Sequence, residues 1–273
     1  MASRQSGGRH VRRATSGVLR FWIVPVTLVL WELLTRVTES PYFPPPSRIA
    51  TQFYDMWLSG PASQLLLTES ALDTFGPSLG RLLAGWTIAG VLGIALGVAL
   101  GRIRGLAEYT DPVLQFLRAL PPPLLVPIFF VLFKIGTPTQ LAVIVFGVIW
   151  PVLVNTTDGV RAVDKGFLET ARVFQFSRYD ILRRVILPSA MPKIFAGLRL
   201  SLSLALILMV VSELVGSNSG IGYSLLYAQQ SYDYTGVWAH IVLLGVLGLL
   251  FNALFLVAEG RVLSWHANAR RNV

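Results

Sequence analysis

Three long runs of apolar residues without a charged side chain most constrain how this chain can fold. They cover residues 82–101, 135–157 and 234–258. A helix needs about 20 such residues to cross the hydrocarbon core of a bilayer, which is roughly 30 Å thick. A buried helix of a soluble protein rarely continues for that length without a polar stripe. The sequence therefore predicts an all-α integral membrane protein.

Weaker apolar segments, interrupted by charge, complete the predicted set. They are residues 21–38 around Glu32, 113–133 around Arg118 and 200–216 around Glu213. The composition agrees, because 53% of the 273 residues are hydrophobic and only 14% are charged, against about 25% in soluble domains. The absence of cysteine excludes a secreted domain held together by disulfides. We expect about six transmembrane helices.

The basic residues are distributed unevenly, and this predicts the orientation in the membrane. Of the 23 Lys and Arg residues, 19 fall in four segments that share one side of a six-helix arrangement: 1–20, 102–118, 158–199 and 259–273. Cytoplasmic loops carry such an excess of positive charge, so both termini are expected in the cytoplasm. The N-terminal arginines could contact anionic lipid, which we favour, or nucleic acid, which we do not expect as a partner.

The chain divides into five parts along its sequence. They are a basic cytoplasmic N-terminus (1–20), a first transmembrane helix (21–38), an outer loop (39–78), a core of five transmembrane helices (79–258) and a cytoplasmic C-terminus (259–273). The first apolar segment could be a cleaved signal peptide, but no small-x-small cleavage site follows it, so we expect a retained helix. The outer loop should contain an amphipathic helix on the membrane surface, because apolar residues recur there at helical spacing: Ile49, Phe53, Met56 and Trp57.

Prolines and glycines mark several of the predicted spans. Prolines at 121–123, 127 and 151 interrupt the helical hydrogen-bond ladder. Membrane helices tolerate such breaks where neighbours or cavity water satisfy the freed carbonyls, so we expect kinked helices around a water-accessible path. Five glycines between 85 and 101 allow helix backbones to approach closely, either in ordinary packing within the bilayer or at a subunit interface.

The long cytoplasmic loop at 158–199 begins with a predicted helix. Asp164 can cap a helix at residues 165–176 by accepting a hydrogen bond from its first turn. The apolar residues of that helix are expected to share one face: Phe167, Ala171 and Phe174.

A second short helix is predicted after a bend in the same loop. Ser177 and Asp180 match a capping box, and the helix that follows, at 178–187, is expected to stop at Pro188. Two capped helices with apolar and basic side chains form a knob that suits docking into a groove of another protein. The alternative is a hairpin that lies on anionic lipid.

This loop resembles the EAA loop of ATP-binding-cassette importer permeases of the binding-protein-dependent type. The family pattern is E-A-A, three residues, G, nine residues and I-x-L-P, and the chain has Glu169-Thr170-Ala171, Gln175 and Val185-Ile186-Leu187-Pro188 at these positions. Thr170 stands where the family has alanine, and Gln175 where it has glycine. Further motifs resemble the nitrate, taurine and sulfonate branch and extend over nearly the whole chain: WELL at 31–34, FPPPS at 43–47, DP at 111–112, NT at 155–156, GLRL at 197–200 and GIGY at 220–223.

The resemblance implies the fold, the partners and the cargo. The fold would be that of a type I importer permease in the inner (plasma) membrane of a bacterium. Two permease copies, expected as a homodimer, would work with a cytoplasmic ATPase dimer and an extracytoplasmic substrate-binding protein. ATP and Mg would belong to the ATPase, because this chain has no phosphate-binding loop motif; we expect it to be no enzyme and to carry no cofactor. The cargo would be a small anionic or zwitterionic solute such as nitrate, a sulfonate or taurine.

The resemblance also implies which residues couple the permease to the ATPase. They are Glu169, Thr170, Ala171, Phe174, Gln175, Leu187 and Pro188.

Polar residues within the apolar spans are separate candidates for the pathway or its gate, because an unpaired polar group in hydrocarbon is costly. They are Glu213, Ser212, Asn218, Asn155 and His240. For Glu213 the alternative is a structural ion pair with a residue such as Arg81. For Asn155, His240 and Asn252 the alternative is hydrogen bonding between helices.

Two other functions remain as alternatives at this stage. A stand-alone secondary transporter would need ionisable relays within its spans, and only Glu213 and His240 offer such groups. A membrane docking scaffold would bind a cytoplasmic protein through the same loop without transporting a solute.

Overall fold

The computed structural model describes residues 22–264, and this part of the chain consists of helices and their connections, without a strand. Its contacts divide the chain into two compact units. The first contains residues up to 68 together with 228–242, and the second contains 69–227 together with the residues after 242. The predicted cytoplasmic N-terminus at 1–20 and residues 265–273 lie outside the described residues.

In the first unit a carboxylate joins two helices, α2 (Ile23–Thr38) and α3 (Pro46–Trp57). Glu32 of α2 accepts hydrogen bonds from the backbone N–H of Ser47, at 3.0 Å, and from its hydroxyl, at 2.7 Å. Ser47 lies in the first turn of α3, where the helix dipole favours a negative charge. Arg36 adds an ion pair with the same carboxylate at 2.6 Å. The charge within the first predicted span is therefore compensated locally.

The amphipathic helix predicted in the outer loop is present as α3. Trp57 is buried while Asp55 is exposed. Pro46 occupies the first helical position, where its missing N–H would have no partner within the helix. The indole of Trp57 meets the imidazole of His240 edge-on, with ring centroids 5.1 Å apart, and this contact joins α3 to the start of α12 (Tyr234–Val262).

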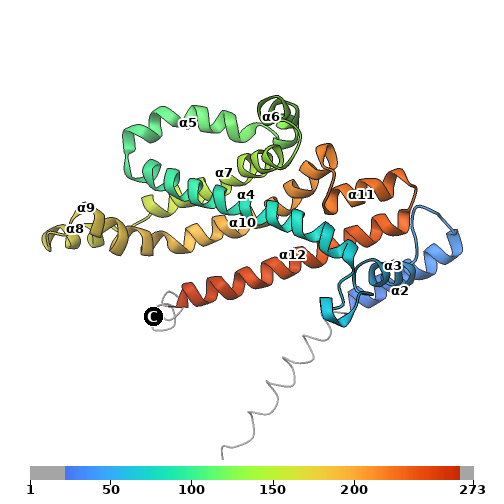
Figure 1. Ribbon diagram of the computed structural model, residues 1–273. Helices are drawn as coiled ribbons and strands as arrows, with labels where there is room; N and C mark the ends of the chain where they lie inside the picture. Colours follow the sequence, from blue (N-terminus) through green and yellow to red (C-terminus); the bar gives the residue numbers. More distant parts are fainter. Residues whose placement is uncertain (1–21, 265–273) are drawn as a thin grey trace, which may run out of the picture. The chain divides into compact units, whose positions relative to one another are not determined.

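The second unit is built on three long helices that lie side by side, α4, α7 and α10 (Figure 1). They cover Glu69–Arg102, Thr137–Arg161 and Leu187–Gly216. Each contains one of the predicted apolar runs and continues it into polar sequence. Helix α7 contacts both of the others, and four of its apolar side chains are completely buried: Val143, Ile144, Val148 and Val152. The core of the unit therefore surrounds α7.

Glycines bring α4 and α7 close together. The hydroxyl of Thr157 on α7 donates to the carbonyl of Gly97 on α4 at 3.2 Å. A Cβ atom at Gly97 would lie 2.6 Å from the Cβ of Thr156, closer than two carbon atoms can approach. Gly93 and Gly101, one turn to either side, meet α7 in the same way. Within the described chain these glycines serve packing of one helix on the next.

The segment 113–133, predicted as one span, is not a single helix. The chain forms α5 (Arg104–Ala119) and α6 (Val126–Phe133), with a bend of 88° between them (Figure 1). The prolines at 121–123 explain the break, since each lacks an N–H and disfavours helical geometry in the residue before it. A short 3₁₀ helix, Pro122–Leu125, connects the two parts.

A second correction concerns Pro188, which does not end a helix as predicted. Helix α9 (Arg178–Asp180) continues into a π-helical segment, Ile181–Ile186, and then directly into α10. A proline normally clashes with the carbonyl four residues before it, and here that carbonyl belongs to the wider π turn. The helical run is therefore continuous from Arg178 to Gly216.

Four or five of the about six predicted spans meet a criterion of length and apolar composition within the residues that the structure describes. Four stretches of the described residues are long and apolar enough to cross a membrane: Ala62–Arg102, Thr137–Arg161, Arg178–Gly216 and Tyr234–Val262. The bent pair of α5 and α6 makes a fifth if it is counted as one span. The first predicted span corresponds to α2, which has 16 residues. A shorter helix, α11 (Ile221–Gln230), lies between α10 and α12.

Replacing Gly97 by alanine is expected to lower the stability of the protein. The new Cβ would collide with Thr156 and with the backbone carbonyl oxygen of Leu153, 2.8 Å away, which cannot rotate aside. Overpacking of this kind costs about 1–3 kcal/mol, so the midpoint of thermal unfolding in detergent should fall by several degrees. Gly80→Ala in the same helix is the control, because nothing lies within 4 Å of its Cβ position and its midpoint should hold or rise. Equal midpoints for the two variants would contradict the close approach of α4 to α7.

Candidate functional site

The first helix of the loop at 158–199 is α8, which covers Lys165–Val173. Asp164 caps it as predicted, because a carboxylate oxygen accepts a hydrogen bond of 2.6 Å from the N–H of Gly166. The hydroxyl of Thr170 donates to the carbonyl of Gly166 at 2.8 Å. The threonine that departs from the EAA pattern is therefore satisfied within its own helix.

The helix ends three residues earlier than predicted, in a bend at Gln175. This residue has a φ of 55°, in the left-handed region that favours glycine. Its N–H donates to the carbonyl of Arg172 at 2.9 Å, and the N–H of Phe176 donates to that of Ala171 at 3.0 Å. This pair of bonds is the common ending of a helix at a glycine. The chain thus makes a tight bend here although glutamine replaces the glycine of the EAA pattern.

Ser177 caps the next helix, in a variant of the predicted capping box. The N–H of Asp180 donates to the Ser177 hydroxyl at 3.1 Å, as expected. The hydroxyl itself donates to the Asp180 carboxylate at 2.6 Å, in place of the expected bond from the Ser177 N–H. Arg184 pairs with the same carboxylate at 3.2 Å. Side chains therefore hold both sides of the bend between α8 and α9.

The predicted common face of α8 is divided in the structure. Ala171 is buried, whereas Phe167 is 61% exposed and Phe174 is 71% exposed. The reason is that the face of α8 toward the rest of the unit passes through Ala171 and Leu168, which leaves both phenylalanines outside it. Ala171 belongs to a buried cluster at the base of α7 and α10, which also contains Val160, Val163, Ile181, Ile186, Ala190 and Ile194.

The remaining coupling candidates also fall into exposed residues and residues that pack against the buried cluster. Glu169 is exposed and forms no ion pair with another residue of the part that the structure describes. Tyr179 on α9 is 66% exposed and adds a third aromatic side chain to the outer surface. Leu187 packs against the buried cluster, and Pro188 beside it is half-buried. The loop therefore presents a charged and aromatic outer surface on an apolar base.

A buried ion pair lies at the opposite end of α10. Glu213 has no exposed side-chain surface, and its carboxylate lies 2.7 Å from Nη1 of Arg81 on α4. The Ser78 hydroxyl donates to the same carboxylate at 2.8 Å, and the N–H of Gly222 donates to it at 2.9 Å. Arg81 also donates to the carbonyl of Ser219 at 3.0 Å. Of the two roles considered for Glu213, the structure contains the ion pair with Arg81.

The same carboxylate fixes the start of α11. Ser78 accepts a hydrogen bond of 2.8 Å from the N–H of Ile221, while Glu213 accepts the bond from Gly222. Two of the free N–H groups at the helix N-terminus are thereby satisfied, beside a negative charge that the helix dipole favours. Gly220 is required here, because its φ is 110° and a Cβ would lie 2.6 Å from the Glu213 carboxyl group.

The other polar candidates mostly bond to their own helices. Within α10, Ser212 donates to the carbonyl of Met209, and within α7, Asn155 donates to that of Pro151, both at 2.8 Å. In α12, Nδ1 of His240 lies 2.8 Å from the carbonyl oxygen of Gly236. The hydrogen bonds between helices considered for Asn155 and His240 are therefore replaced by bonds to a carbonyl one turn earlier in the same helix.

Two further polar residues do not bond within their own helices. Asn252 accepts a bond of 3.3 Å from Arg199 on α10, between helices, and Asn218 is exposed in the connection before α11.

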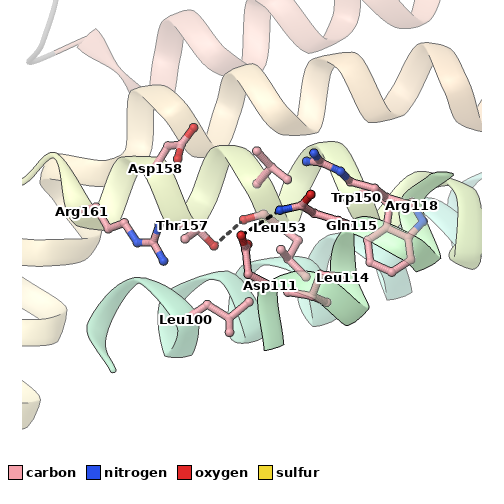
Figure 2. A pocket seen from close by; sticks show the side chains of 11 residues that line it. Leu100, Asp111, Leu114, Gln115, Arg118, Trp150, Leu153, Thr157, Asp158 and Arg161 are labelled. Carbon is pink, nitrogen blue, oxygen red and sulfur yellow. Dashed lines mark hydrogen bonds between the residues drawn. The ribbon is translucent and has the colours of Figure 1, made fainter. Parts of the chain in front are cut away.

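A cavity of about 250 Å³ lies between α5 and α7 (Figure 2). Its charged side chains come from both helices: Asp111 and Arg118 from α5, and Asp158 and Arg161 from α7. Figure 2 shows Arg118 at one end, Arg161 and Asp158 at the other, and Asp111 with Gln115 between them. Nε2 of Gln115 donates to the Asp111 carboxylate at 2.9 Å. A larger cavity of about 970 Å³ shares Asp111 and Arg161 with the first.

Sequence reasoning did not bring these cavity residues together. One signal was available, because Arg118 interrupts an apolar segment that was predicted to span the membrane. The fold of α5 alongside α7 was not foreseeable from that segment, since it depends on the bend after Ala119.

Comparison with known proteins identifies the family. Residues 89–264 match the family described as binding-protein-dependent transport system inner membrane component. The chain is 32% identical to SsuC of Bacillus subtilis, a permease named for aliphatic sulfonate transport, over 93% of this chain and 90% of that protein. It is 30% identical to the nitrate import permease NrtB of Leptolyngbya laminosa, again over 93% and 90% of the two chains. The bicarbonate transport permease CmpB of Synechococcus elongatus is also 30% identical, over 92% and 91%.

The fold is shared with permease chains of solved importers. A chain of the MetNI methionine ABC transporter, in an inward-facing conformation, superposes with a TM-score of 0.55 at 19% identity, over 68% of this chain and 93% of that one. A chain of an amino acid ABC transporter reaches a TM-score of 0.57 at 18% identity, over 70% and 92%. The predicted type I importer permease fold is confirmed. The chain belongs to the family of inner membrane components of binding-protein-dependent transport systems, and it is a multi-pass permease subunit of an ATP-binding-cassette importer.

Proposed function

We propose that this chain pairs with a second copy of itself to form the pathway by which a small anion enters a bacterial cell. Three relatives are named for an aliphatic sulfonate, nitrate and bicarbonate, and all three solutes are small oxoanions. The two arginines that line the cavity between α5 and α7 offer an anion hydrogen-bond donors, beside two carboxylates. A zwitterion such as taurine would also find both signs of charge there.

The observation that carries the coupling part of the proposal is the outer surface of α8 and α9. Phe167, Phe174 and Tyr179 are each more than half exposed. Covering such a side chain contributes roughly 1.5–3 kcal/mol, so these residues favour a protein partner. Glu169, on the same helix as the two phenylalanines, has an exposed carboxylate, which disfavours the alternative of a hairpin resting on anionic lipid.

Force on this surface would pass directly into the transmembrane part. Ala171 is packed in the buried cluster with Ile186 and Ala190, which belong to the helical run that begins at Arg178. That run is continuous as far as Gly216. A displacement of α8 by the partner would therefore move α10 along its whole length, because packed interiors have low compressibility.

Glu213 has a supporting role in this proposal. Its carboxylate is buried and fully engaged, so it is unsuited to bind a passing solute. It holds the connection at 217–220 against α4, where Asn218 is exposed and available to the pathway. Ser212, Asn155 and His240 bond to their own helices and are proposed to shape the pathway rather than to bind the cargo.

The partners follow from the proposed mechanism. A cytoplasmic ATPase dimer would bind and hydrolyse ATP with Mg, and its closure would act on the loop of each permease copy. An extracytoplasmic binding protein would deliver the solute, with both permease termini in the cytoplasm and the assembly in the inner membrane. Membership of the family does not support the stand-alone transporter or the docking scaffold considered from the sequence.

Reversing the charge at Glu169 is expected to separate the permease from its ATPase. Glu169→Lys reverses the charge of an exposed side chain on the helix proposed to contact the ATPase, so co-purification of the ATPase should be largely lost and uptake of the labelled anion should fall at least tenfold. Asp55→Lys is the control, because it makes the same charge change at an exposed position of α3. Normal uptake and normal ATPase recovery with Glu169→Lys would refute the coupling role.

The left-handed bend at Gln175 gives a second prediction. Gln175→Gly should raise the thermal unfolding midpoint slightly and keep ATPase binding, since glycine adopts this conformation without steric cost. Gln175→Val should lower the midpoint and reduce ATP-driven uptake, because a β-branched residue is strained at a positive φ. If valine were tolerated as well as glycine, the bend would not be the element that sets the position of α8.

The pair of Arg81 and Glu213 can be examined with a double-mutant cycle. Glu213→Leu alone leaves a buried guanidinium without its partner, and breaking such a pair costs about 3–5 kcal/mol. Adding Arg81→Met should restore part of this loss, which denaturant unfolding in detergent would measure. The two single losses would simply add if the side chains did not interact.

A further inference from the structure

Two arginines that line one cavity have no partner among the residues described here. Arg118, near the end of α5, and Arg161, at the end of α7, form neither an ion pair nor a side-chain hydrogen bond within that part of the chain. Arg81, by contrast, is engaged by Glu213 and by the carbonyl of Ser219. Because a guanidinium stays charged at physiological pH, an arginine without a protein partner requires water or a ligand.

The position of Arg118 strengthens this requirement. It is the single charged residue of the apolar segment 113–133, and it lies just before the 88° bend between α5 and α6. Its side chain is exposed at the end of the basic segment 102–118, and broken helices are tolerated in membrane proteins where they line a water-filled cavity. The cavity between α5 and α7 provides such surroundings.

Arg161 connects this cavity to the larger one. The larger cavity reaches the base of α8, and three further cations line it: Arg102, Lys165 and Arg172. Among the described residues none of the three is in an ion pair. The two linings together hold five cations and three carboxylates, and an excess of one sign of charge raises the local concentration of ions of the opposite sign. Together the two cavities make a route that carries unpaired positive groups along its length.

Carboxylates within the route determine how firmly an anion would be held. Asp111 and Asp158 line the first cavity and Glu108 the second. Their negative charge weakens the attraction of the arginines for an anion, because they line the same two cavities as the cations. A transport site must bind well enough to admit its ligand and weakly enough to release it. A lining with both signs of charge therefore suits a site that binds an anion briefly and releases it, rather than one that holds it tightly.

We propose that the cavity between α5 and α7 is the permease's own anion-binding position, and that Arg118 and Arg161 select for negative charge. An oxoanion would accept N–H hydrogen bonds from Arg118, pass to Arg161 and leave through the larger cavity. Guanidinium groups suit this task because their N–H groups match pairs of oxygen atoms. The proposal rests on the proposed function, that the cargo is a small anion, and it adds the residues that recognise the cargo within the permease.

The absence of cysteine from the chain permits a direct test with one introduced thiol. Val154→Cys places the thiol in the lining of the first cavity. The assembled importer is treated with two methanethiosulfonate reagents, one carrying a sulfonate group and one carrying a trimethylammonium group. Mass spectrometry of this chain then measures how fast each reagent modifies the introduced thiol. Ala84→Cys is the matched control, because it lines a cavity beside Arg81, whose charge is already paired. Leu114→Cys, in the same lining as Val154, serves as a second reporter.

For each variant we compare the reaction rate of the sulfonate reagent with that of the ammonium reagent. This rate ratio is expected to be about tenfold higher at Val154→Cys than at Ala84→Cys, because unpaired arginines concentrate anions. Arg118→Gln and Arg161→Gln should each reduce this preference several-fold. Arg48→Gln, which removes an exposed arginine of α3, should not change it. Nitrate or methanesulfonate should slow the modification, while chloride at equal ionic strength should not.

Equal rates for the two reagents, or a preference for the ammonium reagent at both reporters, would overturn the proposal and assign the selectivity to Asp111 and Asp158.

Uptake assays distinguish a failure of the proposed function from a failure of the cavity assignment. If the unaltered importer takes up neither nitrate, bicarbonate nor methanesulfonate, the proposed function fails. If uptake is normal and Arg118→Gln changes neither uptake nor the reagent preference, the cavity assignment alone fails.

Discussion

The buried ion pair between Arg81 and Glu213 is the interaction on which the second unit depends. Removing two charges from water costs several kcal/mol per ion, and attraction offsets this only if the remaining donors and acceptors are satisfied. Here they are, because Ser78 and the N–H of Gly222 complete the carboxylate and Ser219 accepts from the guanidinium. The pair therefore fixes α4, the end of α10 and the start of α11 to one another, and none of the three can shift without exposing an unpaired charge.

The same helix that ends at this pair begins in the loop that we propose contacts the ATPase, so the unit has one stiff axis. The run from Arg178 to Gly216 is unbroken, and α7 packs beside it as well as against the glycines of α4. The bent pair of α5 and α6 has a different character, because its segment changes direction by 88°. In this arrangement the stiff helices would transmit movement, and α5 of the bent pair lines the two cavities in which the unpaired arginines lie.

The uncharged runs at 82–101, 135–157 and 234–258 were sufficient to predict three of the long helices, because crossing a bilayer leaves few other solutions. The caps at Asp164 and Ser177 were also predictable, since capping is local chemistry. The prolines at 121–123 indicated a break but not its direction, which depends on tertiary packing. Partners distant in sequence, such as Ser78 with Ile221 or Arg118 with Arg161 in one cavity, leave no pattern in a single sequence.

The π-helical segment explains a spacing that regular helix geometry would not allow. Ile181 and Ile186 are five residues apart, yet both are buried in one cluster with Ala190 and Ile194, which continue at intervals of four. The wider turn absorbs one residue and keeps a single apolar stripe from the loop into α10. The number of residues between the bend at Gln175 and Pro188 consequently sets the rotation of the loop about the helix axis. One residue more or fewer would turn the loop by roughly 100° about that axis and direct its aromatic surface away from the proposed partner.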